Sequence, residues 1–554
     1  MIQALPSETV PEDPEGHVWD VIVIGAGAGG STAGFNLARL GRSVLFVERG
    51  KLLHHDPAVV RGKPFFWKDN PETALNHGWW PRPVYEEMRG AALPMRPPFG
   101  SGTGGSTAQF GAVMDRFRPE DFTPRRFFTD TPEASLPEAW PISYEEMAPF
   151  YARAESLYRV RGTQDPLALA ASSLLEPPPA SDREVGVFSA LQGAGLNPYR
   201  IHSASERVPG CVGCPGMLCP RACRNDAARV CLYPALERHG AKILPNCRAI
   251  RLEETGRVVE RVICESNGRQ MALRARVFIL AANAFLTPAL LQRSANQRFP
   301  NGLANSSGLV GRNLMFHATD RLFVRLKHTR PALGFNINHG LSLNDFYVDG
   351  GTKLGNIHAH PRATRDVLMR FLVQYYLQSG GEGGGGGGGG GGSSFRKWAA
   401  YLPGSLLRMM TSAGTFLCRS WTVFAAIIED LPYTGNYVAA KAGSEEDIVY
   451  TYRYPDELAR RARLLADRFK KSVEPFFDVF TLQTGALNGT HVCGTCRFGD
   501  DPQTSVLDRD NRAHDLDNLY VLDASFFPSS GGINPSLTIV ANSLRATDKI
   551  GQRL

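Results

Sequence analysis

The sequence predicts an α/β fold that begins with a parallel sheet. The run "WDVIVIG", which ends at Gly25, is short, apolar and rich in β-branched residues, as buried parallel strands are. The segment "STAGFNLARLG" follows with helical spacing of its apolar residues and ends at Gly41, a typical helix stop. A second buried strand, "SVLFVE", comes next. Residues 18–48 are therefore predicted to form one β-α-β unit.

A glycine motif lies where the predicted first strand meets the helix. Gly25, Gly27 and Gly30 form G-x-G-x-x-G. The first glycine allows a tight turn, the second lets the backbone approach a pyrophosphate, and the third lets the helix pack on the strand. The N-terminus of the helix then offers its N–H groups to the phosphates. Glu48 ends the second strand, about twenty positions on, where an acidic residue is expected to bind ribose hydroxyls. The unit predicts a dinucleotide site, with FAD and NAD both open.

The composition is that of a globular protein of ordinary charge. The chain has 554 residues, 43% hydrophobic and 21% charged, with a formal net charge of +7. It contains no dense run of Lys or Arg, so nucleic-acid binding is not expected. The polar, acidic N-terminus lacks the apolar core of a signal peptide, and no apolar stretch approaches the ~20 residues of a membrane span. We therefore expect a cytoplasmic protein.

Loops and regular elements alternate along the rest of the chain. Residues 85–130 are rich in Gly, Pro and Arg and are expected to be mostly loop, and residues 205–225 form a cysteine-rich loop. Helical spacing predicts a helix within 133–160 and an amphipathic helix at "DELARRARLLADRFKKSV" (456–473). The segment "RVFILAANAFLTPALLQRSA" (276–295) predicts a strand, a turn and a helix.

One tract stands apart in composition. Twelve of the thirteen residues 380–392 are Gly, and such a tract cannot bury apolar surface, so we expect a disordered or artificial linker. The segment that follows, 395–428, is rich in aromatic residues and Met, with scattered Arg and Lys. We expect a buried lid or a wall of the substrate site there. Contact with a membrane surface is the alternative.

Further motifs, taken in order, resemble a known family. They are "GTGGSTAQF" (102–110), "ILAANAFLTPALLQRSA" (279–295), "GLVGRNLMFH" (308–317) and a C-terminal block that contains "HVCGTCRFG", "NLYVLDASFFP" and "NPSLT" (491–538). Together with the first glycine motif they resemble the glucose–methanol–choline (GMC) family of FAD-dependent alcohol oxidoreductases, almost from end to end. The resemblance implies an FAD cofactor and oxidation of CH–OH to a carbonyl by hydride transfer to flavin N5.

The resemblance also implies roles for individual residues. His491 stands where the family carries its active-site histidine, and Asn534 where it carries a second His or Asn. The alcohol must lose its O–H proton, which a neutral imidazole accepts near pH 7, and a second polar group must support the charge that develops on oxygen. Gln109 stands where some relatives attach FAD through a histidine, so we expect non-covalent FAD. The residues implied to bind FAD are Gly25, Gly27, Ala28, Gly30, Glu48, Gly104, Gly105, Ser106, Gln109, Asp523, Asn534 and Pro535.

The cysteines form two groups whose chemistry stays open at this point. Cys496 in "HVCGTCRFG" stands where many family members carry a cysteine without a metal or redox role. Pairing of this C-x-x-C with Cys211 and Cys214 around zinc is the alternative. The second group, "CVGCPGMLCPRAC", is spaced C-x2-C-x4-C-x3-C, and some bacterial sugar dehydrogenases of the family hold an iron–sulfur cluster on similarly spaced cysteines, here Cys214, Cys219 and Cys223. We expect no metal at either group.

The resemblance implies two discontinuous domains. A Rossmann-like FAD-binding domain would comprise residues 18–130, 215–318 and 485–554, and an inserted α+β substrate-binding domain would comprise residues 131–214 and 319–484. The α/β class follows from the residues themselves, whereas the domain borders follow from the resemblance alone. The flavin ring is then expected beneath His491 and Asn534.

The leading interpretation is an enzyme that oxidises a hydroxyl of a sugar, a glycoside or a related polyol. Oxidation of a lipophilic alcohol by the same chemistry is one alternative, with the apolar segment 395–428 forming the pocket. A non-catalytic electron-transfer flavoprotein with a Cys-ligated cluster is an alternative from another class, and it would leave His491 without a use. The expected electron acceptor is O2, a quinone or a redox protein.

Overall fold

The structure is a computed structural model, and it describes residues 7–63, 70–88, 91–209, 211, 214–327, 340–359, 421–482 and 487–554. The Gly-rich tract 380–392 and residues 395–420 of the expected lid lie outside the described residues. In the part of the chain that is described, none of the helices combines the length and the apolar character needed to cross a membrane. The α/β fold predicted from the sequence is confirmed, and it is built on two large sheets.

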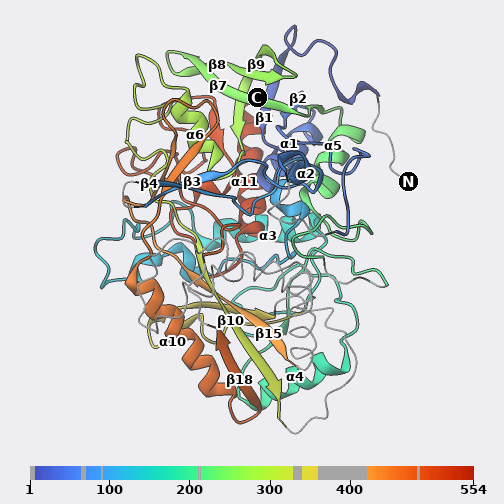
Figure 1. Ribbon diagram of the computed structural model, residues 1–554, viewed down its shortest axis with the longest axis vertical. Coiled ribbons are helices and arrows are strands. Elements are labelled where there is room, and N and C mark those ends of the chain that lie inside the picture. Colours follow the sequence, from blue (N-terminus) through green and yellow to red (C-terminus); the bar gives the residue numbers. More distant parts are fainter. Residues whose placement is uncertain are drawn as a thin grey trace.

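The first sheet has seven strands and lies in the upper half of Figure 1. Strand β1 runs parallel to β2 and β9, and β7, β8 and β9 form an antiparallel extension. Helix α1 (Ala28–Arg39) connects β1 to β2, so the predicted β-α-β unit is confirmed at the centre of a Rossmann-like sheet. The spatial order is β6 (Lys242–Leu244), β2 (Val44–Val47), β1 (Val18–Ile24), β9 (Arg269–Leu280), β8 (Val258–Ser266) and β7 (Cys247–Thr255), and β19 (Leu519–Val521) pairs with β9.

The last helix of the chain packs beside the first one. Helix α11 (Ser536–Arg553) contacts both α1 and α3 (Tyr144–Leu157) near the centre of the molecule (Figure 1). The hydroxyl of Ser543 donates to the carbonyl of Gly29 at 2.8 Å, and the amide of Asn36 donates to Thr547 Oγ1 at 2.9 Å. Segments from the two ends of the sequence therefore complete one layer of helices beside the first sheet.

The second sheet has six antiparallel strands and lies in the lower half of Figure 1. Its apolar face packs on α10 (Asp456–Val473) and α4 (Asp182–Gly193). Because side chains alternate along a strand, Leu322 faces α10 while His317 and Thr319 lie on the opposite face. The strand order is β18 (Phe477–Leu482), β10 (His317–Leu326), β15 (Thr422–Glu429), β14 (Gly355–Ala359), β11 (Leu341–Leu343) and β5 (Tyr199–Arg200).

A four-stranded sheet includes a short part of residues 85–130, which are otherwise mostly loop, as the sequence predicts. Strands β3 (Val84–Met88) and β4 (Ala91–Met95) form a hairpin there, and β3 pairs in parallel with β17 (Ile448–Thr451). The pairing partner lies far along the chain, so no local pattern marks this strand. The sheet joins segments of both predicted domains, whose borders stay a prediction. Its fourth strand is β16 (Tyr437–Ala440), and a small hairpin is formed by β12 (Val348–Asp349) and β13 (Thr352–Lys353).

The helix expected within 133–160 is shorter than that range. It begins at Tyr144 because Ser143 caps it, with a reciprocal contact between the backbone of Ser143 and the side chain of Glu146. The amphipathic helix at 456–473 matches α10 at both ends. Among the described residues, the remaining helices are α2 (Pro71–Asn76), α5 (Tyr233–Arg238) and α6 (Leu286–Arg293), with single turns at Ser7–Thr9, Gly105–Ala108, Pro119–Phe122, Pro124–Phe127, Ala228–Leu232 and Ala524–Phe526.

Candidate active site

The first glycine motif forms a loop with space on one side only. Gly25 has φ +100°, and a Cβ there would lie 2.4 Å from the carbonyl oxygen of Ala281. A Cβ on Gly30 would lie 2.0 Å from the carbonyl oxygen of Gly25, so this glycine permits close packing of α1. A Cβ on Gly27 would meet nothing nearer than the Cα of Gly105, at 4.0 Å. Helix α1 starts after Gly27 without a side-chain cap, so open space and unpaired N–H groups coincide and fit a pyrophosphate.

Glu48 joins the two glycine-rich loops. Its carboxylate accepts hydrogen bonds from the backbone N–H groups of Ala26 at 2.9 Å, Gly50 at 2.7 Å and Gly102 at 3.2 Å. The N–H of Gly104 donates to the carbonyl of Ala26 at 2.8 Å. The structure thus brings the predicted acidic residue, the predicted phosphate loop and the glycine-rich motif at 102–110 together at the ends of β1 and β2. The contact of Glu48 with a ribose stays a prediction.

Gln109 carries a buried acceptor without a partner. Its amide nitrogen donates to the carbonyl of His77 at 2.7 Å, whereas Oε1 has no hydrogen-bond partner among the described residues. Ser106, in the same loop, accepts from the N–H of Gly100 at 3.0 Å. An orphaned buried acceptor costs about 1–3 kcal/mol, so a donor supplied by a bound cofactor fits this position. Together with the open space at Gly27, it indicates that the residues present fit a flavin dinucleotide.

Asp523 links the C-terminal block to the loop after β9. Its carboxylate accepts from the N–H of Ser525 at 2.8 Å, the N–H of Asn283 at 2.9 Å and the hydroxyl of Thr287 at 2.5 Å. Pro535 immediately precedes α11, so the residue before it lies at the entrance of that helix. The carboxylate therefore fixes two sequence motifs, 240 residues apart, in one place. Direct contacts of Asp523 and Pro535 with FAD stay predictions.

The two predicted catalytic residues lie side by side. The amide nitrogen of Asn534 is 3.4 Å from Nε2 of His491, and the amide nitrogen of Asn488 is 3.3 Å from the same atom. His491 is half-buried. Desolvation lowers the pKa of His491 well below its usual range, and positive charge on Arg321, or on His317 and His358 when they are protonated, acts in the same direction. The imidazole is therefore neutral at pH 7, with two amide groups at one edge.

Sequence reasoning missed two neighbours of His491. Nδ1 of His317 lies 3.0 Å from Nδ1 of His491, and the two rings are nearly perpendicular, with centroids 5.0 Å apart. Nε2 of His317 lies 2.7 Å from the carbonyl oxygen of Gly531. His317 ends the motif "VGRNLMFH", and Asn488 precedes His491 by three residues, so the sequence motifs contained both residues without indicating their contact.

A buried ionic network lies behind these residues. The ammonium group of Lys353 is 2.5 Å from Asp121 and 2.7 Å from Glu429, and none of the three side chains is exposed. The hydroxyl of Tyr347 donates to Asp121 at 2.7 Å, and the N–H of Gly531 donates to Glu429 at 3.2 Å. The network therefore holds the backbone of Gly531, whose carbonyl oxygen accepts the hydrogen bond from His317.

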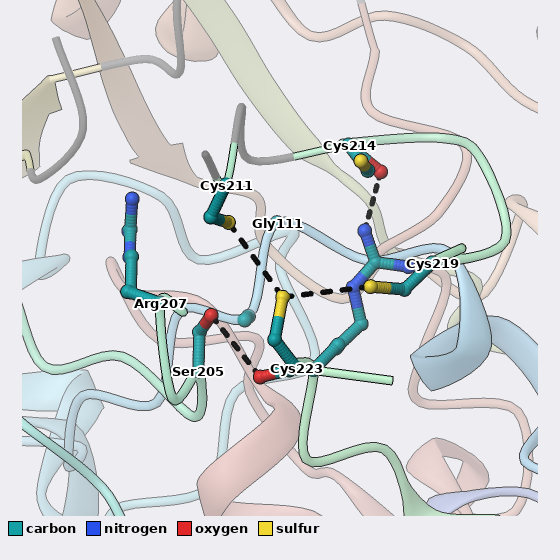
Figure 2. A pocket seen from close by; sticks show the side chains of 9 residues that line it. Gly111, Ser205, Arg207, Cys211, Cys214, Cys219 and Cys223 are labelled. Carbon is teal, nitrogen blue, oxygen red and sulfur yellow. Dashed lines mark hydrogen bonds between the residues drawn. The ribbon is translucent and has the colours of Figure 1, made fainter. Parts of the chain in front are cut away.

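The cysteine-rich loop forms a separate small pocket, shown in Figure 2. Sγ of Cys223 lies 3.6 Å from that of Cys211 and 3.5 Å from that of Cys219, and Cys214 also lines this pocket. The two cysteines of the C-terminal C-x-x-C are fully buried elsewhere in the hydrophobic core. Among the residues that the structure describes, no group of three or more His, Cys, Asp or Glu side chains is arranged to hold a metal ion. The zinc and iron–sulfur alternatives therefore gain no support.

Known proteins place the chain in a family. Models of the N- and C-terminal parts of the GMC oxidoreductases match residues 140–319 and 442–543. The 6'''-hydroxyparomomycin C oxidase of Streptomyces lividus is 29% identical over 97% of this chain and 92% of its own length. The paromamine 6'-oxidase of Streptomyces fradiae is 30% identical over 96% of this chain and 91% of its own. This chain belongs to the GMC oxidoreductase family.

The fold is also similar to that of solved structures. A solved structure of the formate oxidase of Aspergillus oryzae is similar with a TM-score of 0.60, at 15% sequence identity, over 97% of this chain and 98% of that one. The chain is therefore an oxidoreductase that acts on CH–OH groups, and its family implies FAD as the cofactor. The predicted family, fold class and enzyme class are confirmed. The individual roles of the site residues stay predictions.

Proposed function

We propose that the substrate is a sugar, a glycoside or a related polyol, and that His491 takes the proton of the hydroxyl that is oxidised. The observation that carries the proposal is the contact of Nε2 of His491 with the amide of Asn534, at 3.4 Å. The likeness to two oxidases named for aminoglycosides, at 29% and 30% identity, supports the substrate class. Non-covalently bound FAD supplies the hydride acceptor, flavin N5.

The two residues have different tasks in this proposal. As the C–H bond gives up its hydride, the O–H proton passes to Nε2 of His491, whose lowered pKa keeps it neutral beforehand. The amide of Asn534 donates a hydrogen bond to the substrate oxygen and stabilises the negative charge that develops there. An amide cannot accept the proton, so the roles are not interchangeable.

Binding of the cofactor follows the geometry of the loops. We assign the pyrophosphate to the Gly25–Gly30 loop with Ala28, the adenosine ribose to Glu48, and the flavin to the loop of Gly104, Gly105, Ser106 and Gln109, with Asp523, Asn534 and Pro535. An amide side chain forms no covalent flavin bond. Acid precipitation should therefore release the yellow colour into the supernatant, and a yellow pellet would contradict non-covalent binding.

The alternatives receive less support. A lipophilic pocket would be formed by residues 395–428, of which only 421–428 are described, mostly as part of β15. A non-catalytic electron carrier would not need the pair of His491 and Asn534. O2, a quinone and a redox protein remain proposals for the electron acceptor.

An air-free substrate screen tests the proposal. Hexoses, alkyl glycosides, aminoglycosides, linear polyols and long-chain alcohols are mixed with the purified flavoprotein, and bleaching of the flavin is followed. We expect bleaching by a member of the first four classes and a loss of ~10²–10⁴-fold in its rate for His491→Ala. The exposed His17→Ala serves as the matched control. Bleaching by long-chain alcohols alone would reject the substrate class, and an unchanged rate in His491→Ala would reject the base.

A further inference from the structure

Three polar groups form a line that ends at the proposed base. The carbonyl oxygen of Gly531 is 2.7 Å from Nε2 of His317, and Nδ1 of His317 is 3.0 Å from Nδ1 of His491. His317 is fully buried, whereas His491 is half-buried. The line therefore runs from the protein interior to the edge where the amides of Asn534 and Asn488 lie.

The chemistry of the first group determines where the protons lie. A carbonyl oxygen can only accept, so Nε2 of His317 must carry a hydrogen. Burial lowers the pKa of His317 to about 4, so at pH 7 the ring is neutral and its Nδ1 holds a lone pair. A lone pair on that atom requires the neighbouring nitrogen, Nδ1 of His491, to be the donor. The remaining nitrogen of His491, Nε2, is then the unprotonated one.

We propose that His317 is a positioning residue that fixes the proton of His491 on Nδ1 and thereby leaves Nε2 free to accept the substrate proton. This inference rests on the proposed function. During oxidation the O–H bond breaks, its electron pair stays on oxygen, and a new N–H bond forms at Nε2. The positive charge then placed on His491 is stabilised by the hydrogen bond that its Nδ1–H donates to His317.

The backbone at the start of the line is held in one orientation. Gly531 has φ +68°, and a Cβ there would lie 2.7 Å from the ring of Phe117. Its N–H donates to Glu429, which also contacts Lys353 at 2.7 Å. Strand pairing places Glu429 directly opposite His317. The buried network thus orients the Gly531 carbonyl toward the imidazole of His317. A histidine that only fills space would not need this orientation.

Two substitutions of His317 separate positioning from packing. In His317→Gln the amide nitrogen can donate to Gly531 and the amide oxygen can accept from His491, because these atoms are spaced like the two ring nitrogens. In His317→Leu the volume is kept and both hydrogen bonds are lost. We expect the rate of air-free flavin reduction at pH 7 to fall by about 10–100-fold in His317→Leu, as for other residues that orient a functional histidine. The rate of flavin reduction in His317→Gln should be much closer to that of the parent protein.

The pH profile provides the readout that packing alone would not change. Loss of the acceptor destabilises protonated His491 more than the neutral form, so the acidic limb of kcat/KM should move to lower pH in His317→Leu and stay in place in His317→Gln. Flavin content and spectrum should equal those of the parent. A lower rate with an unmoved limb, or equal losses in both variants, would overturn the inference.

The parent protein offers a measurement that does not depend on turnover. In holoenzyme labelled with 15N-histidine, with the His491 signals identified by their absence in His491→Gln, we expect a protonated Nδ1 and an unprotonated Nε2. A protonated Nε2 in the neutral ring would overturn the inference even if His491→Ala abolishes flavin bleaching. If His491→Ala leaves bleaching unchanged, the proposed function itself is wrong, whatever the tautomer.

Discussion

The ammonium group of Lys353 lies 2.5 Å from the carboxylate of Asp121, and neither side chain is exposed to solvent. Glu429 completes the network at 2.7 Å. Two carboxylates and one ammonium group share a site that is closed to solvent, and their attraction raises the pKa of Lys353 despite the opposing effect of burial. The network joins β13, β15 and the turn Pro119–Phe122, all beside the proposed active site.

Lys353→Met should destabilise the protein strongly. Removal of one partner leaves two buried carboxylates facing each other, and such losses cost about 3–5 kcal/mol of the free energy of unfolding. Urea unfolding of the holoenzyme, followed by circular dichroism, measures the change. Lys470→Met is the control, because Lys470 is exposed and lies 3.9 Å from Glu474 in a surface pair worth ~0–1 kcal/mol. Equal stability of the two variants would contradict a structural role for the network.

Gly27→Val should fold but lose FAD. A Cβ at Gly27 has 4.0 Å of clearance, and the residue has φ −83° and ψ −162°, which valine adopts readily. The side chain would instead fill the space assigned to the pyrophosphate. The absorbance of the flavin per protein, with circular dichroism for the fold, measures the effect. Gly435→Val, where nothing lies within 4 Å of an added Cβ, should stay fully yellow. A fully yellow Gly27→Val variant would place the phosphate loop elsewhere.

Substitutions of Asn534 should differ by the chemistry of the new side chain. Asn534→Asp places a carboxylate beside an oxygen that becomes negative, so the rate of flavin reduction should fall by at least ~10²-fold. Asn534→His should be milder, because imidazole can still donate a hydrogen bond. Air-free stopped-flow measurements and thermal unfolding of both variants test this. If both slow the reaction equally and both destabilise the fold, Asn534 only turns the chain before Pro535.

The pH dependence follows from the lowered pKa of His491. A protonated imidazole cannot accept the substrate proton, so kcat/KM declines as the pH falls through the pKa of the free enzyme. Dense packing around the ring, reinforced by the positive charge of Arg321, lowers that pKa well below 6.5. The profile should therefore be flat from about pH 8 through pH 6.5 and decline only at lower pH. A limb centred at or above pH 6.5 would show that the ring is more solvated than its surroundings indicate.

Local sequence patterns were sufficient to predict the elements whose buried residues recur with the period of a helix or a strand. Helix α10 matched at both ends because Leu458, Ala462, Leu465 and Phe469 recur at helical spacing and all are buried. Strand β1 was equally clear, because its residues 21–24 form a continuous buried run of Val and Ile, as in parallel strands that are covered on both faces. The hairpin of β3 and β4 escaped prediction, because its stabilising partner is β17, with Val449 opposite Tyr85. Such pairing leaves no mark in a short window of sequence.

The sequence predicted residues that form the candidate site, but it did not predict the contacts between them. The motifs named His491 and Asn534, and the structure places them 3.4 Å apart. The contact of His491 with His317 joins positions 174 residues apart, and it depends on how strand β10 and the C-terminal loop meet. Glu48 shows the same limit, because two of its three backbone contacts, with Ala26 and Gly102, come from two other loops whose approach only the folded chain defines.

Strand β19 pairs with β9, and helix α11 packs on α1, so these contacts determine the order in which the nascent chain can fold. Strand β1 leaves the ribosome roughly 500 residues before β19, an interval of ~25–100 s at ~5–20 residues per second. Throughout synthesis, the apolar surface of α1 that meets α11 has nothing to cover it. Chains that stop early would keep this surface exposed and would be substrates for chaperones and proteases, so cells should accumulate the complete protein or nothing.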